Sequence, residues 1–159
     1  MFRKMRREDR LLSNEEAIKI LISCSHGVLA CLGDNDYPYA IPLNYVYYNN
    51  KIYFHSAKEG HKIDAIKNNN KVSFSVVEKE IVISEKYSTY FKSAIIFGKA
   101  RIVTGKEKTE AFWALVEKYS SNRPKDEKEK MINNCDSSHI IAIDIEHISG
   151  KESFQYKPK

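Results

Sequence analysis

The sequence contains no long hydrophobic run, and this absence excludes several classes of protein. No apolar stretch among the 159 residues approaches the length of a membrane span, and the N-terminus lacks the apolar core of a signal peptide. We therefore expect a cytoplasmic protein with no membrane partner. The 42% hydrophobic and 30% charged residues are typical of a folded globular chain. The length suits a single domain over residues 1–159.

Cysteine is scarce, and the common spacing signatures of metal and nucleotide sites are missing. Cys24, Cys31 and Cys135 form no C-x-x-C pair, and an odd number without a secretion signal indicates reduced thiols. His55 and His61 have no third ligand at a recognisable spacing, so no metal site is predicted. G-x-G-x-x-G, the P-loop motif, H-E-x-x-H and G-x-S-x-G are also absent, which argues against the enzyme classes that they mark.

Positive charge exceeds negative charge, but the excess is concentrated near the N-terminus. The net charge is +5, and residues 1–10 hold five basic against two acidic side chains. A basic N-terminal arm over residues 1–12 could attract polyanions. Because acidic residues interrupt this arm and no basic stripe follows it, we expect no nucleic acid partner.

The spacing of apolar residues predicts more strands than helices. A capping box, Ser13-Asn-Glu-Glu16, begins a helix over 14–24. Further helices are predicted over 62–69 and, with Phe112, Leu115, Val116 and Tyr119 on one face, before Pro124. The segment 125–135 is either a solvated helix or a loop, 78–90 is polar with a short β-prone part, and the tail from about 151 is expected to fray. Strands are predicted over 28–32, 39–48, 51–56, 71–77, 93–103 and 140–148.

Consecutive hairpins with few helices favour an antiparallel barrel with helical plugs over a parallel, doubly wound sheet. The predicted class is mainly β with flanking helices. Gly98 lies in the middle of a long strand, where a bulge or a close backbone approach is expected. Pro42 interrupts another strand and cannot donate a ladder hydrogen bond, so that strand lies at an edge or diverges there.

The stretch HSAKEGHK, residues 55–62, combines small residues with a basic helix start. The first amides of a helix have no internal partners, and together with the Lys62 ammonium they would suit a phosphate. A solvated turn bearing Lys58, His61 and Lys62 is the competing interpretation. Basic residues in a first helical turn oppose the helix dipole, which favours an anion ligand.

The hairpin turn at Asn49-Asn50 connects this stretch to the strand with Pro42. Residues 41–44 and 55–57 are therefore expected to be neighbours across antiparallel strands. Divergence at Pro42 would free backbone groups, and Asn44 would add a donor and an acceptor. The two features together predict a ligand with a phosphate at one end and a planar, hydrogen-bonding head at the other, such as a nucleotide-like cofactor.

Three segments in the same order resemble the 5-nitroimidazole-resistance (Nim) reductases, a branch of the pyridoxamine 5′-phosphate oxidase-like flavoproteins. They are MRREDRLL, YPYAIPLNYVYYNNKIYFHSAKEGHKIDAI and IEHISGKES. The resemblance implies an FMN-binding split β-barrel of about six antiparallel strands. It also implies a homodimer with FMN at the subunit interface and a small-molecule electron acceptor. The C-terminus has no counterpart of the Trp and Arg with which the oxidase branch binds pyridoxal phosphate.

The resemblance also assigns roles to single residues. Ala40, Ile41, Pro42, Leu43 and Asn44 would run along the flavin ring, and Asn44 would bind its polar edge. His55 would lie on the substrate side as the candidate catalytic residue, and Ser56 and Ala57 would border the ring and ribityl chain. Gly60, His61 and Lys62 would take the phosphate, with His61 replacing the arginine of the oxidase branch. Ser93 would reach the flavin of the second subunit.

These expectations describe an FMN-dependent oxidoreductase of the nitroimidazole reductase type. The alternative is a non-catalytic flavin- or haem-binding protein that serves in storage or sensing, with one of the five histidines as a haem ligand. Turnover separates the two, because bound flavin that a nitroimidazole never reoxidises would favour the alternative.

Overall fold

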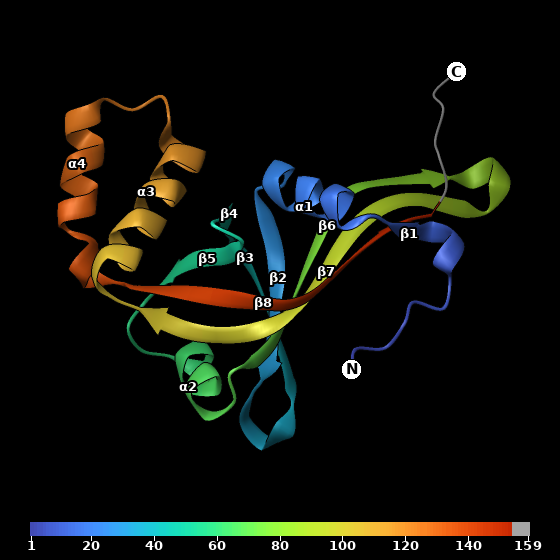
Figure 1. Cartoon of the computed structure of the whole chain (residues 1–159), viewed down its shortest axis with the longest axis horizontal. Coiled ribbons are helices and arrows are strands. Elements are labelled where there is room, and N and C mark those ends of the chain that lie inside the picture. Colours follow the sequence, from blue (N-terminus) through green and yellow to red (C-terminus); the bar gives the residue numbers. More distant parts are fainter. Residues whose placement is uncertain (154–159) are drawn as a thin grey trace.

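One antiparallel sheet of eight strands curls around the core of the protein (Figure 1). The computed structural model describes residues 1–153. Seven strands follow the spatial order β3-β2-β6-β7-β8-β5-β4, and β1 pairs with β8. The mainly β, antiparallel prediction is confirmed, with eight strands in place of about six. The strands are β1 (Leu11–Leu12), β2 (His26–Leu32), β3 (Pro38–Asn44), β4 (Val46–Tyr48), β5 (Lys51–Ser56), β6 (Lys71–Ile83), β7 (Ser88–Val103) and β8 (His139–Glu152).

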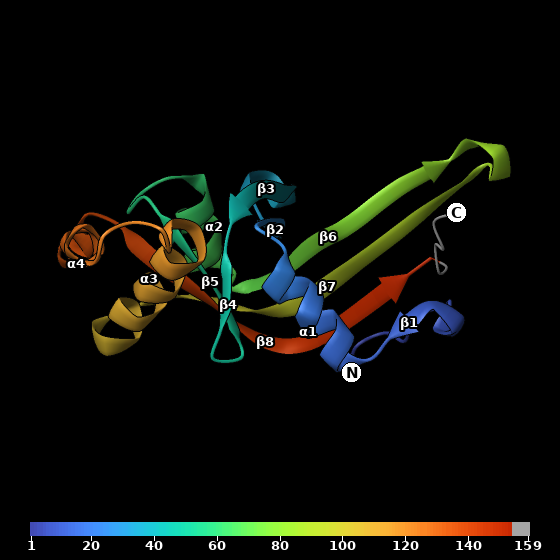
Figure 2. The same cartoon turned by 90° about the horizontal axis from the view of Figure 1, so that it is seen from above.

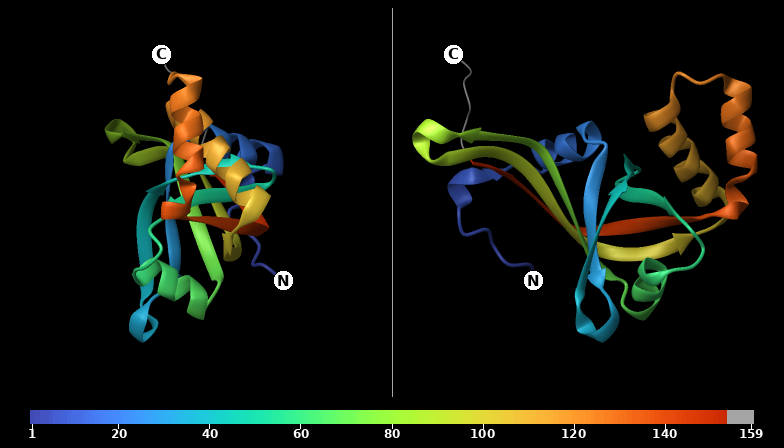
Figure 3. Two further views of the ribbon diagram at one scale, coloured as in Figure 1. Left: turned by 90° about the vertical axis from the view of Figure 1, so that its left-hand side faces the viewer. Right: turned by 180° about the vertical axis from the view of Figure 1, so that it is seen from behind.

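Four α-helices flank the sheet, and two of them supply side chains to the barrel core. They are α1 (Asn14–Ser23), α2 (His61–Asn68), α3 (Gly105–Ser120) and α4 (Lys125–Asn133). α1 and α2 bury Ala17, Ile20, Leu21, Ile63, Ala65 and Ile66 in the main core. α3 and α4 stand together beyond one end of the sheet (Figure 3). Among residues 1–153, none of these helices is both long and apolar enough to span a membrane.

The local signals for the first helix are confirmed in atomic detail. The Ser13 hydroxyl accepts a hydrogen bond from the Glu16 amide at 3.3 Å, and the Glu16 carboxylate accepts one from the Ser13 amide at 2.9 Å. This reciprocal capping box starts α1 as the S-x-x-E motif predicted. The segment 125–135, left open between helix and loop, contains α4, which buries only Ile132.

The strand predicted over 39–48 divides at Tyr45 into β3 and β4. β3 pairs with β2, whereas β4 pairs with β5, so the two halves lie at opposite edges of the sheet. The prediction of one continuous strand was therefore wrong. The chain passes from one edge of the sheet to the other at Tyr45, and within residues 1–153 the two edges do not pair, which is the gap of a split barrel. We call this gap the split.

β6 and β7 extend well beyond the predicted strands as a long hairpin that projects from the barrel (Figure 2). The sequence did not predict a hairpin over 78–90 because apolar and polar residues alternate poorly there. In the structure most of these residues are exposed. Its ladder continues through the pairs Lys79↔Lys92 to Ile83↔Ser88, so backbone hydrogen bonds rather than burial define it. β8 likewise runs to Glu152, so residues 151 and 152 of the tail predicted to fray belong to a strand. Residues 154–159 lie outside the described residues.

Two backbone predictions from single residues are confirmed. Pro42 lies in β3, which is an edge strand of the sheet. A register shift between Phe97 and Gly98 marks a bulge in the β7–β8 ladder. A Cβ atom at Gly98 would lie 2.8 Å from Ile143 Cγ2 and closer still to the Asp144 carbonyl oxygen, so the backbone of β8 approaches closely there. Both hydrophobic cores include side chains of β7 and β8.

Candidate functional site

A cavity of about 660 Å³ adjoins the split, between the sheet and the α3–α4 pair. Asn44, at the end of β3, and His55, near the end of β5, both line it. Its other walls come from α3, α4 and the turn that follows α4. None of the residues that line it within the described part of the chain, 1–153, is an aspartate, glutamate, lysine or arginine. The lining residues are Asn44, His55, Phe112, Leu115, Val116, Tyr119, Ser120, Met131, Asn134, Ser137 and Ser138.

β3 presents alternate side chains to the core and to the outside. Ile41 and Leu43 pack against the barrel core, whereas Ala40, Pro42 and Asn44 are exposed. One side of the strand pairs with β2, and no strand among residues 1–153 pairs with the other side. Backbone groups along that free edge are therefore available to a ligand. The Asn44 side-chain amide donates to the Ser25 carbonyl oxygen at 3.0 Å, which fixes its orientation.

The residues of the predicted HSA segment, at the end of β5, differ in their exposure. His55 is exposed and faces the cavity, while Ser56 is 5% exposed and Ala57 is exposed after the strand ends. β5 pairs with β8 from Lys51 to Ser56, but its other side pairs with β4 only as far as Tyr53. The expected strand pairing of residues 41–44 with 55–57 is therefore wrong, because the β4–β5 ladder ends at Val46 and β3 pairs with β2 instead. Asn44 and His55 nevertheless meet in one cavity.

Gly60 and His61 form the start of α2, but the His61 side chain is already engaged. Gly60 has a φ of 121° and is exposed, so the turn into α2 uses a backbone conformation that glycine favours. His61 Nε2 accepts a hydrogen bond from the Asp34 amide at 3.2 Å, and its ring stacks on Tyr39 at 4.1 Å. His61 thus fastens α2 to the turn between β2 and β3. Its predicted contact with a phosphate stays a prediction.

Lys62 differs from His61 because no ion pair joins it to any carboxylate in residues 1–153. Its side chain is half-buried, with Nζ 5.6 Å from the centre of the Phe54 ring. Burial lowers the pKa of the Lys62 ammonium, since the folded chain removes water from the charge without supplying a counter-ion. Such a charge fits an anionic ligand group better than it fits the unliganded fold.

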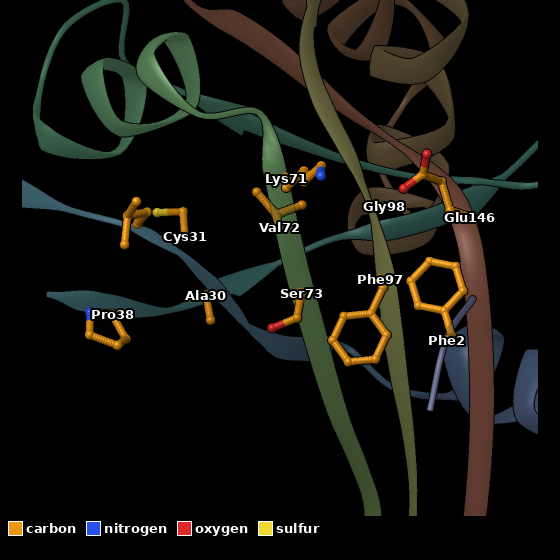
Figure 4. A pocket seen from close by; sticks show the side chains of 11 residues that line it. Phe2, Ala30, Cys31, Pro38, Lys71, Val72, Ser73, Phe97, Gly98 and Glu146 are labelled. Carbon is orange, nitrogen blue, oxygen red and sulfur yellow. The ribbon is translucent and has the colours of Figure 1, made fainter. Parts of the chain in front are cut away.

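Ser93 lies apart from the other predicted residues, on a sheet face that faces away from the core. This open face carries outward side chains of β2, β6 and β7 that include Val28, Leu32, Val77, Ile95 and Phe97, each at least 38% exposed. A shallow groove of about 350 Å³ crosses it (Figure 4). Phe2 of the N-terminal arm stacks on Phe97 at 5.6 Å beside this groove.

The sequence did not indicate that α3 and α4 form part of the site. Phe112, Leu115, Val116 and Tyr119 were predicted as the packing stripe of a helix, and Leu115 is indeed buried. The same stripe also forms a cavity wall. Its tyrosine, at the end of an otherwise apolar face, was the available signal that this stripe serves more than packing.

Known proteins resemble this chain in sequence or in fold. An uncharacterised protein of Rhizobium meliloti (strain 1021) is 33% identical over 85 residues, which cover 49% of this chain and 55% of that protein. The chain thus aligns with about half the length of that relative. A candidate 5-nitroimidazole antibiotic resistance protein of Bacteroides thetaiotaomicron VPI-5482 has a TM-score of 0.75 at 19% identity, covering 89% of this chain and 86% of that one.

A third similar protein is the FAD and haem binding protein of Mycobacterium smegmatis. It has a TM-score of 0.73 at 18% identity, covering 92% of this chain and 74% of that one. At these identities the two solved structures establish the shared fold alone. The sequence profile described as pyridoxamine 5′-phosphate oxidase matches residues 13–152, which include the split, both of its strand edges and the α3–α4 wall. The chain therefore belongs to the pyridoxamine 5′-phosphate oxidase family.

Proposed function

We propose that this protein binds FMN at the split and acts as an oxidoreductase of the nitroimidazole reductase type. The observation that carries the proposal is the cavity in which Asn44 and His55 meet between two unpaired strand edges. A flat ring system with a polar edge suits the free backbone of β3 and the fixed amide of Asn44. Lys62 is half-buried and has no carboxylate partner in residues 1–153, so it suits the phosphate end of such a cofactor.

Bound FMN would supply electron transfer between a reductant and an acceptor, and the chain would supply binding and orientation. Lys62 would hold the phosphate, the edge of β3 with Asn44 would orient the ring, and α3 would exclude water. His55 would hold or deliver a proton through its imidazole at the substrate side. The walls that residues 1–153 give the cavity carry no carboxylate, lysine or arginine, which favours a neutral, flat acceptor such as a nitro-heteroaromatic compound.

Reconstitution tests the proposal directly. Purified protein incubated with FMN, and in parallel with FAD, should retain a yellow chromophore after gel filtration. Bound FMN, reduced without oxygen, should then be reoxidised by a nitroimidazole. We expect His55→Leu to keep FMN binding and to slow reoxidation about tenfold, because it removes the one imidazole that residues 1–153 place in the cavity wall. Protein that retains neither flavin would contradict the proposal.

Haem binding is the second candidate, and one observation favours it. His55 is the histidine in the wall of the cavity, whose other lining residues include Phe112, Leu115, Val116 and Met131. An imidazole beside an apolar cavity is the usual setting of a haem ligand. The similar protein of Mycobacterium smegmatis binds FAD and haem. Incubation with haemin should in this case yield a Soret band that His55→Leu shifts or abolishes.

We further propose that two copies associate through the open sheet face. Val28, Ile95 and Phe97 on this face are between 39% and 43% exposed, and serines at 73 and 75 lie between them. Apolar side chains gathered on one face are typical of a surface that another molecule covers. Ser93 belongs to the same face, so a second copy docked there could bring its Ser93 towards the first copy's site.

Charge placed on the open sheet face should weaken this association. Ile95→Lys is expected to weaken the dimer about tenfold, because a desolvated ammonium in an apolar interface lacks a partner. Analytical ultracentrifugation over a concentration series measures the effect. Ile22→Lys, on the exposed side of α1, is the matched control and should leave association unchanged. Equal behaviour of the two variants would count against this face as the interface.

A further inference from the structure

Phe97 and His147 form an aromatic platform that continues the open sheet face onto β8. They are paired residues of β7 and β8, so their side chains project from the same side of the sheet. Their ring centres lie 6.2 Å apart, and their ring planes differ by 17°. Two neighbouring rings that are nearly parallel offer a flat apolar surface on which a third ring can stack.

Phe2 of the N-terminal arm covers this platform. Its ring centre lies 4.7 Å from that of His147 and 5.6 Å from that of Phe97, and the ring planes differ by 13° and 9°. Figure 4 shows the rings of Phe2 and Phe97 next to each other. Both spacings are usual for offset-stacked rings, which attract one another beyond the effect of the apolar area that they bury. Within one chain, the arm thus caps the platform.

The arm is attached to the sheet at its two ends and only loosely between them. β1 pairs with β8 at the end of the arm, whereas the backbone of residues 1–6 makes no hydrogen bond to the backbone of any residue in 1–153. A hollow of about 550 Å³ lies between the arm and β8. Segments with few backbone hydrogen bonds and little buried surface open at low cost. Phe2 can therefore leave the platform while the sheet stays intact.

A second copy docked on the open sheet face would compete with Phe2 for this platform. In a two-fold dimer the same surface of each copy meets the other, so both arms would lie in one interface. Arg3 and Lys4 line the hollow beside the platform, and no carboxylate of residues 1–153 pairs with either. Glu146, in the wall of the neighbouring groove, already pairs with Lys99 at 3.1 Å. Enclosing the unpaired cations of both copies would cost desolvation and repulsion, which favours association with the arms released.

We propose that Phe2 is a cap on the Phe97–His147 platform and that two copies associate only when this cap is released. The capped chain cannot associate, so the cap lowers the fraction of chains that are competent to do so. Because both copies must be uncapped, this fraction enters the dissociation constant of the dimer twice. The inference rests on the proposed association through the open sheet face and is independent of the cofactor.

Phe2→Gln removes the ring and should tighten the dimer about tenfold, because the platform is then uncovered in every chain. Analytical ultracentrifugation of the cofactor-free protein over a concentration series measures the dissociation constant. Phe2→Tyr keeps a ring that can stack and is the matched control, with a dissociation constant within about twofold of wild type. A wild-type chain that stays monomeric at every concentration should become dimeric in Phe2→Gln.

The position of the cap is measured separately, by proton NMR of dilute, monomeric protein. The resonance of the His147 Hε1 proton, assigned by its loss in His147→Asn, is shielded by the stacked Phe2 ring. We expect this resonance to move downfield in Phe2→Gln and to stay in place in Phe2→Tyr. An unchanged resonance in Phe2→Gln would show that Phe2 does not cover the platform and would overturn the cap.

The association measurements can overturn the proposal in two further ways. A weaker dimer in Phe2→Gln would make the arm part of the interface instead of its competitor. Unchanged association in Phe2→Gln would show that the second copy does not need the platform. If Ile95→Lys still weakens the dimer in that case, the open sheet face remains the interface and only the competition fails. If Ile95→Lys has no effect either, the proposed interface fails together with the competition.

Discussion

Replacing Lys62 by methionine is expected to weaken FMN binding about 10- to 100-fold, the usual contribution of a hydrogen bond to a charged group. Methionine keeps most of the apolar stem that packs beside Phe54 and removes only the ammonium. Because burial lowers the pKa of that ammonium and no carboxylate of residues 1–153 pairs with it, the charge does not stabilise the unliganded fold. The free energy of unfolding without cofactor should therefore stay unchanged or rise.

Opposite responses of binding and stability distinguish this prediction from simple loss of structure. FMN titration measures the first quantity and urea unfolding of the cofactor-free protein the second. Lys67→Met is the matched control, since Lys67 is an exposed residue of the same helix. It should leave FMN affinity within about twofold of wild type. An FMN affinity in Lys62→Met equal to that of the wild type would contradict the assignment of Lys62 to the phosphate site.

Substituting alanine for Gly98 should destabilise the fold by about 2–3 kcal/mol, as overpacking of a closed site usually does. The new Cβ would lie 2.8 Å from Ile143 Cγ2 and closer still to the Asp144 carbonyl oxygen. Because one obstacle is the backbone of β8, a change of rotamer cannot relieve the contact. The β7–β8 ladder would have to shift at its bulge, and both cores pack against these strands.

Gly105→Ala separates this steric effect from the general effect of replacing glycine. Gly105 has a φ of 59°, but a Cβ there would meet no heavy atom within 4 Å. Only the backbone strain remains, about 1 kcal/mol. Urea unfolding of both variants gives the comparison, with an unchanged m-value as the sign that the unfolded state is the same. An equal decrease in the free energy of unfolding of the two variants would mean that the backbone of β8 can move away from the new Cβ at little cost.

The sequence predicted part of the candidate site, namely which residues belong to it, but not the contacts that some of them make. Asn44 and His55 were placed together through the Asn49-Asn50 hairpin, and they do line one cavity, although the strands that carry them do not pair there. Lys62 and His61 were treated alike because both are basic and adjacent. The structure separates them, since Asp34 and Tyr39 hold His61 while Lys62 has no carboxylate partner in residues 1–153.

The sequence by itself determined the features that depend on a residue and its near neighbours. The capping box of α1, the edge position of the strand with Pro42 and the bulge at Gly98 each follow from local backbone chemistry, and each is present. Alternation of apolar residues likewise determined an antiparallel, mainly β fold. These features can be predicted from the sequence because secondary-structure propensity and the spacing of apolar residues act over a few neighbouring residues.

Only the tertiary structure decided where the barrel stays open. Nothing in the alternation of residues 39–48 indicates a break at Tyr45, because the break arises where β3 pairs with β2 and β4 pairs with β5 at the opposite edge of the sheet. Three further features are of the same kind: the cavity wall from α3 and α4, the lack of a carboxylate partner for Lys62 within residues 1–153, and the exposed sheet face with Ser93. Each depends on which distant segments pack together, and a hydroxyl or an ammonium acquires its role only from the groups that packing places around it.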